Sequence, residues 1–102
     1  MSTQTANTWY VYLVRMPSRA LYCGITTDVE RRFAQHQNGQ GAKALKGKAP
    51  LILEWCYPAG ENRSEASKYE WRIKKLPKSK KEHLISFQTD SSITLDMLLV
   101  GL

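Results

Sequence analysis

The chain has 102 residues, of which 42% are hydrophobic, and its 15 Lys and Arg against 9 Asp and Glu give a net charge of +6. This length predicts one domain with its own core, without a separate recognition domain. The positive charge favours a polyanion such as nucleic acid as partner. A membrane span is excluded, because the longest apolar stretch, residues 97–100, is far shorter than the roughly 20 residues that a spanning helix needs.

The first residues and the two cysteines indicate the compartment. Residues 1–8 are polar and lack the basic and apolar segments of a secretory signal, so we expect a disordered lead-in. Cys23 and Cys56 each lie inside an expected strand, and their spacing matches no zinc motif. We therefore expect a soluble, cytoplasmic protein whose two thiols are reduced.

Residues 9–26 predict a β-hairpin, because two runs rich in aromatic and β-branched residues flank a polar turn. Side chains alternate along a strand, so Tyr10 and Tyr12 share one face of the first run. Tyr22 and Gly24 likewise share a face of the second run. Gly24 leaves a gap in which a ligand could approach the backbone. For any single tyrosine, an amphipathic hairpin that buries the ring and keeps the hydroxyl wet is a sufficient explanation.

A helix over about 28–38 follows the hairpin. A capping box at residues 27–30, opened by the Thr27 hydroxyl, predicts its start, and the glycines in 39–41 predict its end. Arg32 and His36 are four residues apart beside the apolar stripe of this helix, so they point the same way.

A short basic segment and a buried strand come next. The basic segment predicts one or two helical turns, and its side chains fit phosphate contacts about as well as a solvated loop: Lys43, Lys46 and Lys48. Residues 51–57 form a nearly continuous apolar run, which predicts a strand covered on both faces. Helices are therefore expected on either side of a small sheet.

A second helix is predicted from the capping box of Asn62 and Glu65 to about residue 76, before Pro77. Glu70 lies in the middle of its apolar stripe, which consists of Ala66, Tyr69, Ile73 and Leu76. A buried carboxylate must be paired, protonated, hydrogen-bonded or metal-bound. The plainer explanation is a surface ion pair between Glu70 and Lys74.

The end of the chain predicts one more short helix and an apolar extension. A third capping box at 79–82 starts the helix. Residues 88–102 are too apolar for a free tail, so we expect them to pack on the domain or on a second copy of the chain.

One set of residues, spread along most of the chain, resembles the motifs of the GIY-YIG nuclease family, in particular its small stand-alone bacterial YhbQ-like members. The set comprises Tyr10-Val11-Tyr12, Tyr22-Cys23-Gly24, Arg32, His36 and Glu70. Tyr10 stands where the family has glycine and Cys23 where it has an aliphatic residue. The resemblance implies a single α/β domain over residues 9–87, with a three-stranded antiparallel sheet flanked by helices in the order β-β-α-β-α-α.

The resemblance also implies roles. Tyr12 would be the general base, and Tyr22 would position water or assist proton transfer. Arg32 would hold phosphate oxygens with its planar cation. Glu70 would bind one Mg²⁺ or Mn²⁺ ion, held weakly without nucleic acid. His36 would act in proton transfer or phosphate binding, and a structural histidine is an equal alternative.

These features predict a metal-dependent endonuclease that acts on DNA rather than RNA, at branched, damaged or single-stranded sites in repair. Its nucleic-acid contacts would include Gly24, Lys43, Lys46, Lys48 and Lys74. A catalytically weak nucleic-acid-binding module of the same fold is the main alternative. A third reading is an interaction partner that self-associates through the apolar segment 88–102.

Overall fold

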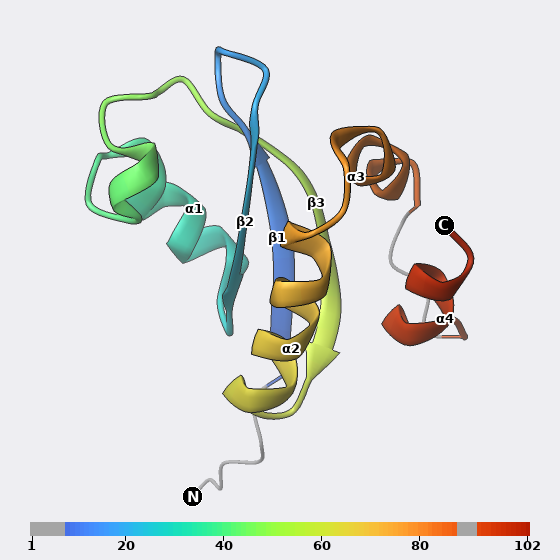
Figure 1. The fold of residues 1–102 in the computed structure, drawn as a ribbon. Helices are drawn as coiled ribbons and strands as arrows, with labels where there is room; N and C mark the ends of the chain where they lie inside the picture. The colour runs from blue at the N-terminus through green and yellow to red at the C-terminus, as the bar shows by residue number, and fades with distance from the viewer. Residues whose placement is uncertain (1–7, 88–91) are drawn as a thin grey trace, which may run out of the picture.

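The computed structural model describes residues 8–87 and 92–102 (Figure 1). The expected lead-in at 1–8, apart from its last residue, and the expected boundary at residue 88 lie outside these ranges. Within them, no helix is both long and apolar enough to cross a bilayer.

A three-stranded antiparallel sheet forms the centre of the domain. It contains β1 (Trp9–Arg15), β2 (Leu21–Thr26) and β3 (Ile52–Gly60), in the order β2-β1-β3. The aromatic and β-branched residues of the three runs favour this extended conformation. The predicted sheet, and the fold class built on it, are confirmed.

Helices cover both faces of the sheet (Figure 1). One face carries α1 (Val29–Gln37) and the short 3₁₀ helix η1 (Lys43–Leu45). The other face carries α2 (Arg63–Lys74) and α3 (Lys78–Ile85). The expectation of helices on either side of the sheet is therefore confirmed. For β3 itself the cover is unequal, since Trp55, Tyr57 and Ala59 on one face are buried and the side chains between them are only half-buried.

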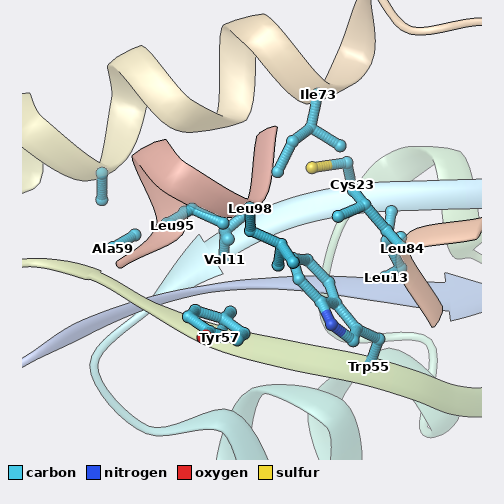
Figure 2. Packing of buried hydrophobic residues seen from close by; sticks show 11 residues of the cluster. Val11, Leu13, Cys23, Trp55, Tyr57, Ala59, Ile73, Leu84, Leu95 and Leu98 are labelled. Carbon is cyan, nitrogen blue, oxygen red and sulfur yellow. The ribbon is translucent and has the colours of Figure 1, made fainter. Parts of the chain in front are cut away.

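The alternation of side chains along β1 divides the interior into two apolar clusters. Val11 and Leu13 face α2 and belong to the larger cluster, whereas Tyr12 and Val14 face α1 and belong to the smaller one. Figure 2 shows the larger cluster, in which the helices supply these side chains: Ala66, Ile73, Leu84, Leu95 and Leu98.

The C-terminal segment completes the larger cluster. It forms α4 (Leu95–Val100), a helix beyond the predicted β-β-α-β-α-α order. The Tyr57 hydroxyl donates a 2.7 Å hydrogen bond to the Ile93 carbonyl, and Arg72 pairs with Asp96 at 2.6 Å. The segment thus packs on its own domain, which was the first of its two expected positions.

The starts of the helices test the capping predictions. Asp28, rather than Thr27, caps α1 and accepts a hydrogen bond from the Arg31 N–H. This prediction was wrong by one residue, because Thr26 already holds the Asp28 N–H and fixes the turn. At α2 the predicted cap is correct, since Asn62 accepts from the Glu65 N–H.

The third capping box is wrong. The helix α3 begins after Pro77, which occupies the N-cap position and makes no side-chain capping bond. Proline fixes φ near the value that a helix start needs, so this helix does not require the Ser79 hydroxyl.

Arg15 fastens α3 to the sheet. Its Nε donates to Glu54 of β3 at 2.7 Å, and its two terminal nitrogens donate to Glu82 of α3 at 2.6 and 2.7 Å. Both carboxylates raise the pKa of Arg15, Glu82 more strongly than Glu54. The guanidinium therefore joins β1, β3 and α3 through charge-assisted bonds.

Candidate active site

The phenol of Tyr12 lies against Gly24 on the neighbouring strand. The two residues are register partners, and a Cβ on Gly24 would lie 2.6 Å from Cζ of Tyr12. The gap at Gly24 is therefore occupied by the Tyr12 ring, and the approach of a ligand to this backbone stays a prediction. The missing side chain serves to seat the tyrosine.

His36 holds the hydroxyl of Tyr12 from α1. The Tyr12 oxygen lies 2.7 Å from His36 Nε2, and the Ala42 N–H donates to His36 Nδ1 at 3.1 Å. Because Nδ1 accepts this bond, the ring proton of the neutral imidazole must be on Nε2. His36 therefore donates to the oxygen of Tyr12.

The surroundings of His36 keep it neutral. Its side chain is buried, and burial lowers its pKa, with a further lowering from the nearby charge of Arg32. An uncharged ring with both nitrogens engaged is well suited to hold the phenol in position.

Gly41 makes this arrangement possible, and the sequence reasoning missed that role. A Cβ on Gly41 would lie 2.9 Å from Cε1 of His36 and 3.0 Å from its Cγ. The helix end does not need Gly41, because Gly39 already supplies the left-handed residue, with φ of 77°. A second glycine beyond the helix end, followed by Ala42, was the signal that could have revealed it.

Tyr22 joins Tyr12 and His36 in a cluster of three rings. Its ring centroid lies 6.4 Å from that of Tyr12 and 5.6 Å from that of His36, which it meets nearly edge-on. These separations are typical of favourable aromatic contacts. The structure thus brings together the two predicted tyrosines and the predicted histidine.

Arg32 supplies the cation beside Tyr12. Burial raises the pKa of Tyr12 to about 12 and Tyr22 adds to the rise, whereas a hydrogen bond and the charge of Arg32 lower it. The side chain of Arg32 also donates to Gln35 at 3.0 Å. Tyr12 is therefore a neutral phenol at pH 7, and its oxygen faces two N–H donors.

Glu70 lies on α2, and its charge acts on Tyr22. Burial raises the pKa of Tyr22; Lys74 opposes the rise, Glu70 adds to it, and Arg32 opposes it. Tyr22 is therefore within electrostatic reach of both the ion pair of α2 and the guanidinium of α1. Glu70 Oε2 is 3.2 Å from Lys74 Nζ, so the surface pair considered above is present.

Glu70 could hold a divalent cation that needs few protein ligands. The described residues contain no group of three or more His, Cys, Asp or Glu side chains placed to share a metal. Zinc, which usually takes three or four such ligands, does not fit this donor set. Mg²⁺ fits, since it often takes one or two carboxylates and completes its shell with waters and substrate phosphate.

The predicted basic segment surrounds η1, directly after the residue that holds His36. Leu45 is buried in the smaller cluster and anchors the segment, while its lysines are exposed. Their contacts with nucleic acid stay a prediction, as do those of Gly24, which is buried, and Lys74, which pairs with Glu70.

Comparisons with known proteins show the family of this chain. The family profile of the GIY-YIG catalytic domain matches residues 8–83. A UPF0213 protein of Vibrio cholerae serotype O1 is 63% identical over 78 residues, 76% of this chain and 77% of that protein. A UPF0213 protein of Serratia proteamaculans is 52% identical over 97 residues, 95% of this chain and 91% of that protein.

A solved structure belongs to the same group. The solution NMR structure of a UPF0213 protein from Bacillus halodurans is 37% identical in sequence, covers 78% of this chain and 83% of that one, and has a TM-score of 0.49. The profile match and the sequence identities confirm the resemblance drawn from the motifs. The chain belongs to the GIY-YIG nuclease family and, within it, to the UPF0213 proteins.

Proposed function

We propose that the protein is a metal-dependent endonuclease that hydrolyses phosphodiester bonds in DNA. Membership of a nuclease family gives the reaction class and makes nucleic acid the substrate. The observation that carries the proposal is the 2.7 Å contact between Tyr12 and His36, with its fixed direction of proton donation. The Tyr12 hydroxyl is thus oriented by the N–H of neutral His36 and by the Arg32 guanidinium, and it lies beside the phenol of Tyr22.

Tyr12 acts as the general base in this proposal. The N–H groups of His36 and Arg32 stabilise the phenolate, which can then take a proton from the attacking water. His36 is not itself the base, because its Nδ1 lone pair is engaged by Ala42 and its Nε2 already carries a proton. Its role is to position Tyr12.

Arg32 and Tyr22 act on the substrate. The guanidinium of Arg32 can hold two phosphate oxygens at once and offset the negative charge that develops during hydrolysis. The charges of Arg32 and Glu70 both act on Tyr22, and its hydroxyl can orient water there. Glu70 would hold a single Mg²⁺ or Mn²⁺ ion, which when bound supplies further positive charge at the phosphate.

A preference for DNA over RNA, and a role at branched or damaged sites in repair, are part of the proposal and rest on the resemblance. The excess of positive charge supports binding of either nucleic acid through counterion release.

A catalytically weak binding module is the second candidate, and two observations favour it. The pKa of Tyr12 is about 12, so very little phenolate exists at neutral pH, and Glu70 is already paired with Lys74. Both features oppose turnover in the absence of substrate.

Plasmid nicking in Mg²⁺ separates the two candidates. The wild type and a Glu61→Ala control, which removes an exposed carboxylate, should nick DNA, whereas Glu70→Ala should not. If wild type and Glu70→Ala are equally inert on plasmid, branched and single-stranded DNA, the protein is not a nuclease of this kind. Salt-dependent binding that survives both Glu70→Ala and Tyr12→Phe, without any cleavage, would establish the binding module.

A further inference from the structure

A polar pocket of about 380 Å³ lies beside the candidate active site, where β1 begins and β2 ends. Its walls come from both strands, from α1 and from the first turn of α2, and the lining residues are Trp9, Ile25, Thr26, Thr27, Arg31, Arg32, Gln35 and Arg63. Most of these side chains carry hydrogen-bond donors. The catalytic scheme above uses only Arg32 among them.

Three arginines line this pocket. Arg31, Arg32 and Arg63 take part in none of the ion pairs found in residues 8–87 and 92–102. Gathering like charges without counter-charges raises the free energy of the folded state. An anion bound among them would remove this cost, so the pocket has the electrostatics of an anion site.

The cations are held in place by neutral contacts. Arg32 donates to the side-chain Oε1 of Gln35 at 3.0 Å, and the guanidinium of Arg63 lies over the Trp9 ring, 5.7 Å from its centroid. Stacking on an aromatic face orients a guanidinium without neutralising it. Neutral supports of this type leave the positive charges available to a ligand.

We propose that this pocket binds a backbone phosphate of the nucleic-acid strand, next to the phosphate held at Arg32. Arg32 both contacts Tyr12 and lines the pocket, so one strand can pass from the candidate active site to Arg63 and Trp9. Arg31 and Arg63 fix the position of the strand and carry no catalytic step. The identity of the ligand as a nucleic acid rests on the proposed function, whereas the anion site rests on the geometry.

Binding in the presence of EDTA tests the pocket without requiring cleavage. A fluorescein-labelled single-stranded DNA oligonucleotide is titrated with the wild type, Arg31→Gln and Arg63→Gln at several salt concentrations, and anisotropy gives the affinity. Each variant should weaken binding about three- to tenfold and reduce the salt slope by about 0.7, the loss of one phosphate contact to a single strand. Arg63→Lys keeps the positive charge but lacks the planar guanidinium, so it should bind more tightly than Arg63→Gln and more weakly than the wild type.

Arg19→Gln is the matched control. It removes the same charge from an exposed residue in the β1–β2 turn, at the opposite end of the hairpin from Thr26. The control should keep wild-type affinity, and all variants are compared by thermal unfolding. Because Arg31 is exposed, its substitution reports on binding even if Arg63→Gln disturbs the start of α2.

The outcomes separate this proposal from the proposed function. Unchanged affinity and salt slope in both pocket variants would overturn the pocket, whether or not the wild type cleaves DNA. Reduced binding in both variants would support the pocket, even if wild-type cleavage were absent and the nuclease assignment had failed.

Discussion

Gly41 and His36 are packed so closely that any side chain at position 41 would overlap the imidazole ring, whose Cε1 lies 2.9 Å from the place of a Cβ. The next residue, Ala42, donates the bond that fixes the ring proton on Nε2. The segment after α1 therefore decides which atom of His36 faces Tyr12.

Replacing Gly41 by alanine should displace His36 and impair cleavage. We expect a loss of about tenfold or more, because the orientation of Tyr12 then depends on Arg32 alone. Gly101→Ala is the control, since a Cβ there meets only ordinary contacts of 3.6 and 3.7 Å. Cleavage rates and thermal unfolding of both variants provide the measurement. Wild-type cleavage by Gly41→Ala would show that His36 does not position Tyr12.

Removing the Tyr12 hydroxyl should abolish the pH dependence of cleavage. With a pKa of about 12, the phenolate fraction rises about tenfold for each pH unit below that value, so wild-type rates should climb steadily above pH 7. Tyr12→Phe should lose about 10²- to 10⁴-fold and show no such climb. Tyr10→Phe removes the hydroxyl from the same face of β1 and should behave as wild type. Parallel pH profiles for wild type and Tyr12→Phe would exclude Tyr12 as the base.

Alkaline pH should destabilise the fold through Cys23. Burial raises the pKa of this thiol from 9.0 to about 12, with Glu70 adding to the rise. Below pH 9 the folded and unfolded chains both hold the proton. Between pH 9 and about 12 only the folded chain holds it, so the free energy of unfolding falls by up to about 1.4 kcal/mol per pH unit.

Urea unfolding at pH 8, 9 and 10 under reducing conditions measures this effect. Cys23→Ala should make the free energy of unfolding fall less steeply with pH, by the contribution of one proton. Cys56, whose pKa is also raised by burial, keeps contributing to the slope in both proteins. Identical declines in wild type and Cys23→Ala would contradict the assignment.

Arg15→Met should destabilise the domain much more than Arg72→Met. Arg15 is four-fifths buried and binds two carboxylates, so its loss removes the partner of Glu54 and leaves Glu82 with only the longer pair to Lys78, at 3.7 Å. We expect a cost of about 1–3 kcal/mol. The pair of Arg72 and Asp96 is largely exposed and should contribute less than about 1 kcal/mol. Chemical denaturation compares the two variants, and equal losses would refute the ranking.

Local signals predicted most of the fold. Aromatic and β-branched runs located all three strands, and Asn62 located the start of α2, because propensity and capping act over a few neighbouring residues. The caps at Asp28 and Pro77 were missed, since several residues nearby could serve and the turn geometry decides among them.

The candidate site was predictable only in part, for a related reason. The motifs pointed to Tyr12 and His36 as members of one site, but their hydrogen bond joins residues 24 positions apart and its direction depends on Ala42. The steric role of Gly41 and the links from Arg15 to Glu82 likewise arise from tertiary contacts. Periodicity and spacing carry no information about such distant pairs.

The sheet separates two apolar clusters of unequal size, and Tyr12 belongs to the smaller. Among the described residues, eleven buried side chains form the cluster under α2 and α4, whereas four form the one under α1 and η1. Local opening costs less free energy where less apolar surface is buried. The layer that contains His36 can therefore open locally and close again around a ligand. The larger cluster on the opposite face keeps the rest of the domain folded while this happens.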